Sequence, residues 1–276
     1  MLVDFKTILA MAEKGNFAIP AFNVYNMETV MGVIAAAEEE KAPVILQVYS
    51  RLFHNEEGYF LAPIVLAAAQ QAKVPVCFHI DHGAGEYEVT RALRYGVSGA
   101  MIDASALPFE ENVALTKRVV ETAAAVGIQV EGELGHIGSV NDDAMGVFTD
   151  PQEAAEYVAQ TGVTALAVLV GNAHGRYKNK PNLDIERVAA IGKATNGLPL
   201  VLHGGTGIPD EQIVAAIKAG IRKINFGTDV CFAFLDAVFA TSREVYAVDL
   251  FMKNAIASVK AYAVSKIRLL GAAGQA

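Results

Sequence analysis

The sequence predicts a (β/α)8 barrel with a C-terminal helical extension, built as a single domain over residues 1–276. Three observations support this fold class. Eight short apolar runs recur along the chain, helix-like segments separate them, and the mean spacing of about 34 residues suits one strand–helix unit. An open doubly wound sheet is the alternative, but no G-x-G-x-x-G motif follows an early strand.

The expected strands are the apolar and β-branched runs. They span residues 17–23, 43–48, 74–79, 98–103, 128–133, 164–170, 198–203 and 221–226. Between them, apolar positions three and four residues apart predict helices. The sequence indicates where one helix begins and ends. Asp150 and Pro151 suit its first turn, and Gly162 suits the left-handed residue after its last turn. After the barrel we expect a helix over residues 253–263 and a small-residue tail over 271–276, either mobile or docked on a neighbouring subunit.

Composition excludes several classes of protein. Hydrophobic residues make up 53% of the chain and charged residues 19%, which argues against disorder. The apolar runs are far shorter than the ~20 residues of a membrane helix, and no secretion signal is apparent, so we expect a cytoplasmic protein. A net charge of −8 without a basic cluster argues against a nucleic-acid partner. Cys77 and Cys231 are too few for a disulfide framework and are expected in the core.

Ionisable residues directly follow four of the expected strands, where a barrel enzyme places its chemistry. These strand ends read His79-Ile80-Asp81-His82-Gly83, Glu131-Gly132-Glu133-Leu134-Gly135, Gly171-Asn172-Ala173-His174-Gly175 and His203-Gly204-Gly205-Thr206-Gly207. Because the carboxyl ends of all strands open on one face of a barrel, these side chains are expected to meet there.

Three of the histidines, His82, His174 and His203, come from different strands and match the three nitrogen ligands of a catalytic zinc site. Imidazole favours zinc over magnesium, although cobalt or iron would fit nearly as well. The alternative for each histidine is a partly buried ring that hydrogen-bonds to nearby backbone. The other histidines are expected elsewhere, in the core or behind a ligand (His79) or at the surface (His54 and His136).

Two carboxylates accompany the histidines. Asp81 directly precedes His82, so it could move a proton to or from a substrate hydroxyl, or instead orient a histidine. Glu133 could be a further metal ligand, or it could hold His82 or His174 in one tautomer. The sequence leaves both pairs of alternatives open.

A phosphate site is expected after the last two strands. Gly204-Gly205-Thr206-Gly207 offers unhindered backbone N–H groups and a hydroxyl, and Asn225-Phe226-Gly227-Thr228 offers more. A helix that begins near Pro209 would add its positive N-terminal end. The alternative is that these glycines only form tight strand-to-helix turns.

Taken in order, these motifs resemble those of the class II, metal-dependent fructose-bisphosphate and tagatose-bisphosphate aldolases. The resemblance covers nearly the whole chain. It rests on Asn23 in A-F-N-V, the A-P-V-I-L-Q run over residues 42–47, the H-x-D-H-G, E-x-E-x-G, A-H-G and H-G-G-T-G motifs given above, and Asn225-x-x-Thr228.

The resemblance implies reversible cleavage of a ketose phosphate to dihydroxyacetone phosphate and an aldehyde, in a homodimer or homotetramer. It places one Zn²⁺ per subunit on His82, His174 and His203 with Glu133 near the metal, and hydroxyl proton transfer on Asp81. It also implies a set of substrate and phosphate contacts, namely Asn23, Gly175, Gly204, Thr206, Asn225 and Thr228. A monovalent cation, Na⁺ or K⁺, on carbonyls near Gly175 and Gly204 is a further implication.

Three positions depart from the family pattern. Asn141 stands where the family has a loop glutamate that moves a proton, so either Asp142, Asp143 or a water is expected to take over that transfer, or the proton step proceeds differently. Gly227 leaves extra room near the phosphate. Gln275 stands near the place of a C-terminal arginine that binds the distal phosphate. Other residues could therefore contact the distal end of the substrate, namely Ser50, Arg51 and Arg268.

Several functions remain open at this point. The substrate could be a fructose- or tagatose-1,6-bisphosphate-like ketose, or a ketose 1-phosphate with another C6 group, such as 6-deoxy-6-sulfofructose 1-phosphate. A Schiff-base aldolase would need Lys223, which enters the last strand from the wrong side. The protein could instead be a non-catalytic accessory subunit of an aldolase, which is a different class of function from an enzyme.

Overall fold

The computed structural model describes residues 1–141, 146–177 and 180–276. Its parallel strands hydrogen-bond in chain order, and the first also pairs with the eighth, so the sheet closes into a barrel. The strands are β1 (Ile19–Asn23), β2 (Val44–Tyr49), β3 (Val76–Gly83), β4 (Gly99–Ile102), β5 (Val130–Leu134), β6 (Ala165–Val168), β7 (Leu200–Leu202) and β8 (Ile221–Phe226). The predicted (β/α)8 barrel is confirmed, and each strand overlaps its expected run.

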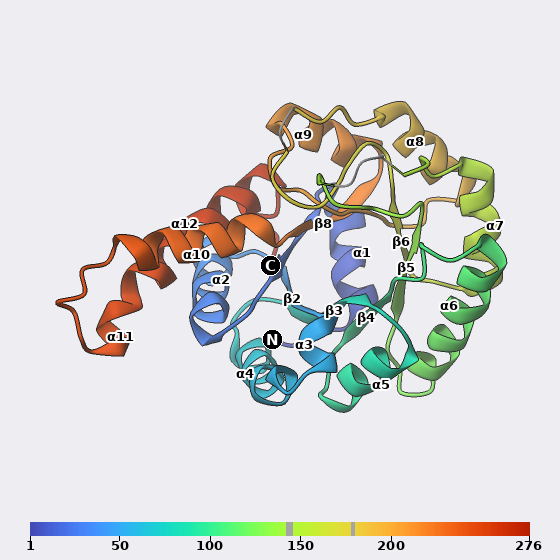
Figure 1. Ribbon diagram of the computed structural model, residues 1–276. Helices are drawn as coiled ribbons and strands as arrows, with labels where there is room; N and C mark the ends of the chain where they lie inside the picture. The colour runs from blue at the N-terminus through green and yellow to red at the C-terminus, as the bar shows by residue number, and fades with distance from the viewer. Residues whose placement is uncertain (142–145, 178–179) are drawn as a thin grey trace.

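Helices surround the barrel (Figure 1). They are α1 (Phe5–Gly15), α2 (Met27–Glu40), α3 (Ser50–His54), α4 (Glu57–Gln71), α5 (Glu86–Arg94), α6 (Phe109–Ala124), α7 (Pro151–Thr161), α8 (Ile185–Ala194), α9 (Asp210–Ala219), α10 (Thr228–Ala240), α11 (Val248–Phe251) and α12 (Lys253–Leu269). No helix of the described residues is long and apolar enough to cross a membrane.

Local chemistry sets the ends of α7 as predicted. The side chain of Asp150 accepts hydrogen bonds from the backbone N–H groups of Gln152 and Glu153, and Pro151 occupies the first turn. Gly162 ends the helix with a φ of 71°.

Strand β3 is longer than predicted. The apolar run ends at His79, but pairing continues to Gly83 after a register shift. The backbone at His82 is left-handed, with a φ of 48°, which is costly for a residue with a side chain. A Cβ at Gly83 would lie 2.3 Å from the carbonyl oxygen of Met101, so only glycine permits this approach to β4. The extension carries Asp81 and His82 to the mouth of the barrel.

Strand β6 is shorter than the predicted run over residues 164–170. The backbone N–H of Leu169 donates to the hydroxyl of Thr149, and that of Val170 donates to the side chain of Asn172. These bonds to side chains replace backbone hydrogen bonds to a neighbouring strand, so the apolar residues Leu169 and Val170 lie outside β6.

The C-terminal tail docks on its own chain, so the expectation of a mobile tail or one docked on a neighbouring subunit is wrong. The backbone N–H of Gly274 donates to the carbonyl of Glu40 at 2.8 Å, and that of Ala276 donates to Lys41 at 2.9 Å. Ala272 is fully buried. The tail therefore satisfies carbonyl groups that the end of α2 leaves open.

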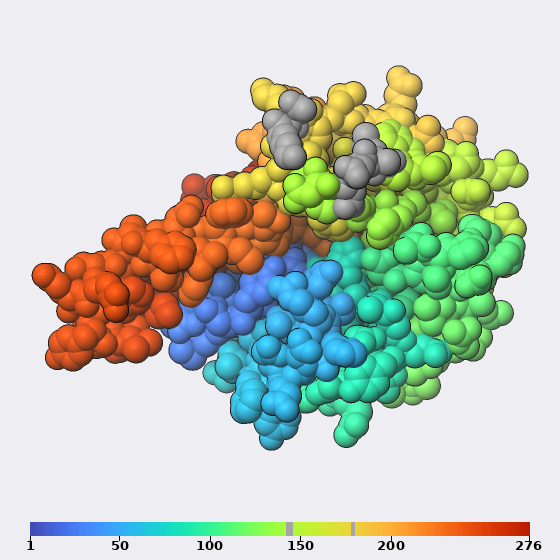
Figure 2. Space-filling model, viewed as in Figure 1, coloured from blue at the N-terminus to red at the C-terminus, as the bar shows by residue number. Residues whose placement is uncertain are grey.

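An arm formed by α10, α11 and the start of α12 projects from the barrel (Figures 1 and 2). It carries many exposed apolar side chains, with Phe239 81% and Tyr246 92% exposed. The others are Phe232, Leu235, Val245, Val248 and Leu250. Exposed apolar side chains gathered on one projecting element form a candidate interaction surface.

The packing of α2 on α12 leads to a stability prediction. A Cβ at Gly32 would lie 2.7 Å from Cγ1 of Val259 and 3.0 Å from the carbonyl oxygen of Ile256. Gly32→Ala gains about 1 kcal/mol of helix propensity but costs about 1–3 kcal/mol through overpacking, so the free energy of unfolding is expected to fall.

Gly192→Ala is the matched control, because its Cβ would meet nothing closer than 3.8 Å. This change in α8 is expected to raise the melting temperature. Denaturant unfolding of both variants gives the comparison, and a Gly32→Ala protein more stable than the wild type would contradict the packing argument.

Candidate active site

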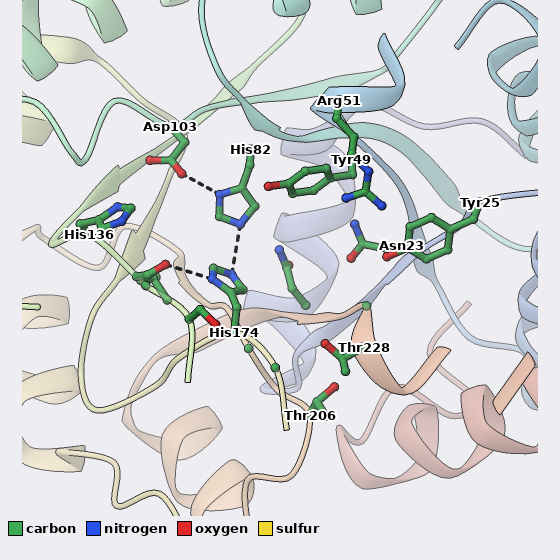
Figure 3. Close-up of a pocket in the computed structure, with 17 residues that line it drawn as sticks. Asn23, Tyr25, Tyr49, Arg51, His82, Asp103, His136, His174, Thr206 and Thr228 are labelled. Carbon is green, nitrogen blue, oxygen red and sulfur yellow. Dashed lines mark hydrogen bonds and ion pairs between the residues drawn. The ribbon is translucent and has the colours of Figure 1, made fainter. Parts of the chain in front are cut away.

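Three histidines converge at the carboxyl end of the barrel, as predicted. His82 is the next-to-last residue of β3, His174 follows β6, and His203 directly follows β7. Nε2 of His82 lies 3.2 Å from Nε2 of His174 and 3.0 Å from Nδ1 of His203 (Figure 3 shows His82 and His174). The three rings therefore present one nitrogen each to a common point.

The outer nitrogen of each ring has an acceptor behind it. Asp103 lies 2.7 Å from Nδ1 of His82, and the carbonyl of Ile137 lies 3.0 Å from Nδ1 of His174. Nε2 of His203 lies 2.9 Å from Oε1 of Glu131. Because these acceptors favour an N–H on the outer nitrogens, the inner nitrogens are left as lone pairs that face one another.

This arrangement fits a tetrahedral metal ion. Zinc–nitrogen bonds of about 2.0–2.1 Å at tetrahedral angles put neighbouring nitrogens about 3.3 Å apart, close to the observed 3.0 and 3.2 Å. Oε2 of Glu133 lies 3.8 Å from Nδ1 of His203, and it is buried without a hydrogen-bond partner among the described residues. The buried carboxylate oxygen is a further candidate ligand.

Among the three histidines of the cluster, the surrounding charges favour a second ring proton on His82 alone. Burial disfavours a charged His82, but Asp81 and the hydrogen bond to Asp103 outweigh it and raise the pKa of His82 to about 10. Burial and the charge on His82 lower the pKa of His174 to about 4 and hold that of His203 well below its usual value. Without a metal, a proton on Nε2 of His82 therefore faces two lone pairs.

Asp81 is buried beside the cluster between two amide side chains. Nδ2 of Asn23 donates to its Oδ2 at 2.7 Å, and Nδ2 of Asn225 donates to its Oδ1 at 3.1 Å. Asp81 forms no hydrogen bond to His82, whose outer nitrogen is held by Asp103 instead. Asp103, rather than Asp81, therefore holds the His82 ring, and proton transfer remains a prediction for Asp81.

Asp103 is a site residue that sequence reasoning missed. It follows the last residue of β4, and its Oδ1 accepts from the hydroxyl of Ser105 at 2.7 Å. The signal was present, because Asp103 closes an apolar run at the same barrel face as the histidines. Its pKa is lowered, since the bond to His82 outweighs burial.

A pocket of about 460 Å³ opens above these groups. The pocket is lined by the predicted substrate and phosphate contacts, namely Asn23, Gly175, Gly204, Thr206, Asn225 and Thr228. Of these, Thr206 and Thr228 lie across the pocket from Asp103 and His136 (Figure 3). A Cβ at Gly204 would lie 2.0 Å from the carbonyl oxygen of Ala173, so glycine lets the loops after β6 and β7 touch. Thr228 is the first residue of α10 and adds a helix N-terminus.

The three possible distal contacts lie in different places. Arg51 lines the pocket, with its guanidinium 4.9 Å from the centre of the Tyr49 ring. Ser50 is buried next to it. Arg268, however, pairs with Glu40 at 2.8 Å at the opposite end of the barrel, where α2 ends. Arg268 is therefore excluded as a contact in its own chain's pocket, because α12 carries it away from the strand ends.

Other histidine and cysteine predictions have mixed outcomes. His79 is buried against Phe5, and Cys77 is buried too, as expected. His54 is exposed and pairs with Glu88. His136 is exposed, as expected, but it also lines the pocket, and its Nδ1 lies 3.0 Å from the hydroxyl oxygen of Ser105. Cys231 is only half-buried, on α10 beside Tyr25, and is not a core residue.

The structure describes the three positions that depart from the family pattern, Asn141, Gly227 and Gln275. Asn141 lies in an exposed turn and does not line the pocket. Asp142 and Asp143 lie outside the described residues. The expected extra room at Gly227 is largely filled, because a Cβ there would lie 3.1 Å from Oδ1 of Asn23. Gln275 lies in the docked tail.

Residues 3–275 match the class II fructose-bisphosphate aldolase family. The fructose-bisphosphate aldolase of Geobacillus stearothermophilus is 40% identical over 284 residues, covering 100% of this chain and 99% of that protein. That of Staphylococcus aureus is 38% identical, with the same coverage of both chains. The crystal structure of the YdjI aldolase from Escherichia coli K12 is 39% identical, with a TM-score of 0.91 over 100% of both chains. The chain belongs to the class II fructose-bisphosphate aldolase family and is an aldolase.

The proton on His82 leads to a prediction about metal binding. A metal must displace this proton, and because the pKa of His82 is raised to about 10, the proton is present at neutral pH. The apparent Zn²⁺ affinity is therefore expected to rise about tenfold per pH unit between about pH 6 and 8. Competition with a chromophoric chelator measures the affinity, and calorimetry in two buffers measures proton release. An affinity that does not change with pH would contradict the assignment.

Proposed function

We propose that this aldolase catalyses metal-dependent, reversible cleavage of a ketose phosphate to dihydroxyacetone phosphate and an aldehyde. The proposal rests on the three-histidine cluster, of which His82 and His174 line the same pocket as the glycine- and threonine-rich loops, with Asp81 buried beside it. One Zn²⁺ per subunit would be held by His82, His174 and His203, with Glu133 as a nearby carboxylate. Such an ion supplies Lewis-acid stabilisation of negative charge on substrate oxygens.

The residues of the chain divide the remaining work. Asp81 accepts the proton of the C4 hydroxyl, and the amides of Asn23 and Asn225 fix its two oxygens for that task. The backbone of Gly175 and Gly204 and the hydroxyls of Thr206 and Thr228 bind the 1-phosphate. Carbonyl groups near the two glycines would hold Na⁺ or K⁺. Asn225 also contacts the triose.

A Schiff-base mechanism has little support. Nζ of Lys223 is fully buried and lies 2.7 Å from Oε2 of Glu131, so it is not a free amine in the pocket. Borohydride trapping with substrate would detect such an intermediate.

Among the described residues that line the pocket, Arg51 is the one lysine or arginine, and it could bind a distal anion. Its guanidinium accepts either a phosphate or a sulfonate oxygen, so two substrates fit. One is a fructose- or tagatose-1,6-bisphosphate-like ketose, and the other is a 1-phosphate with a sulfonate at C6, such as 6-deoxy-6-sulfofructose 1-phosphate.

The test is an aldol-direction assay with dihydroxyacetone phosphate and three aldehydes that end in a phosphate, a sulfonate or a neutral group. Wild-type protein is expected to form product with at least one anionic aldehyde and to lose activity with chelator. Asp81→Asn should lower kcat about 100- to 10,000-fold and retain zinc. Arg51→Met should raise KM about tenfold for the anionic aldehydes alone.

Each outcome has a definite meaning. Turnover that survives complete zinc removal, or an Asp81→Asn protein with unchanged kcat, would overturn the mechanism. Zinc-loaded protein that joins none of the aldehydes would favour an accessory role instead.

We also propose that the exposed arm pairs with a second copy of the chain, giving a homodimer or homotetramer. Phe239→Lys with Tyr246→Lys is expected to dissociate the assembly in sedimentation velocity, because the two rings are the most exposed apolar side chains of the arm. Val126→Lys, at a 63% exposed position after α6, is the control and should leave the assembly intact. A wild-type monomer would contradict the proposal.

A further inference from the structure

A chain of fully buried polar side chains lies beneath the histidine cluster. Glu131 on β5 and Lys223 on β8 have no exposed surface, and neither does His79 on β3. Nζ of Lys223 lies 2.7 Å from Oε2 of Glu131, and Oε1 of Glu131 lies 2.9 Å from Nε2 of His203. Glu131 therefore bridges a buried ammonium group and one histidine of the cluster.

Such a chain is unusual in a barrel interior, which is commonly filled by branched apolar side chains. Removing an ammonium and a carboxylate from water is costly, and their attraction often fails to compensate for that cost. Neither nitrogen of His79 has a hydrogen-bond partner in the described part of the chain, although Nε2 lies 3.8 Å from Oε2 of Glu131. Fold stability alone does not explain these residues.

We propose that Lys223 and Glu131 are positioning residues that fix the tautomer of His203. This inference rests on the metal site proposed above. Glu131 accepts the proton of Nε2, so Nδ1 is left as the lone pair 3.0 Å from Nε2 of His82. With the proton on Nδ1 instead, His203 would point an N–H into the cluster and could not bind a metal.

Lys223 has a separate part in this arrangement. Nζ of Lys223 donates to Oε2 of Glu131, which leaves Oε1 free to accept from Nε2 of His203. The pair thus keeps Glu131 an acceptor on the side that faces the metal site.

The test uses a substitution that keeps the shape but changes the donors. In Glu131→Gln the amide oxygen bonds best to the Lys223 ammonium, so the amide NH₂ faces Nε2 of His203. The imidazole then accepts at Nε2 and carries its proton on Nδ1. Zn²⁺ affinity is expected to fall about 10- to 100-fold, as measured by chelator competition.

A second substitution should reverse this loss. Glu131→Gln with Lys223→Met removes the ammonium, so the amide can turn its oxygen to His203 and its NH₂ toward Nε2 of His79. Zn²⁺ affinity is expected to recover to within a few-fold of the wild type. Lys218→Met, at an exposed position near the end of α9, is the matched control and should leave affinity unchanged.

Two further readouts separate this role from a structural one. Spectra of ¹⁵N-histidine-labelled, metal-free protein are expected to show the His203 proton on Nε2 in the wild type and on Nδ1 in Glu131→Gln. Circular dichroism and thermal unfolding in chelator show whether each variant folds.

The outcomes are distinguishable. Wild-type zinc binding with an unchanged affinity in folded Glu131→Gln would overturn the inference and leave the metal site intact. A folded double variant that binds zinc no better than Glu131→Gln would also overturn it. A wild type that binds no zinc would instead refute the proposed function.

Discussion

The structure of the site depends on a single constraint: three imidazole rings turn their lone pairs toward one point while acceptors hold their far sides. Asp103, the carbonyl of Ile137 and Glu131 provide those acceptors. Lone pairs repel one another, so this arrangement needs a positive charge at its centre. A proton on His82 supplies it without metal, and a divalent cation would supply it in the working enzyme.

The barrel makes this convergence possible. His82, His174 and His203 are far apart in the sequence, but the closed order of strands brings their ends to one rim. The same rim carries Asp81 between two amides and the glycine-rich loops across the pocket. The strand ends thus hold the proposed proton acceptor and the candidate metal site, and the loops that follow them form the proposed phosphate-binding surface. Beneath the histidines, the charged side chains of Glu131 and Lys223 occupy a part of the barrel interior that apolar side chains usually fill.

Much of this was predictable from the sequence because strand ends are marked by a change from apolar to polar residues. That change located the histidines, Asp81 and the phosphate loops. The change from apolar to polar residues did not predict features that depend on backbone and side-chain hydrogen bonds. β3 runs beyond its apolar residues to Gly83, and Asp103 was read only as the last residue of a strand run. Partners distant in sequence were also out of reach, such as Glu40 for Arg268 and the end of α2 for the tail.

The central claim is that three imidazoles bind one divalent ion. X-ray absorption at the zinc edge of the purified, zinc-loaded protein tests this most directly. The account predicts a first shell that includes three imidazole nitrogens at about 2.0–2.1 Å, with the multiple-scattering pattern of histidine rings. A shell of oxygen atoms without imidazole scattering would contradict it.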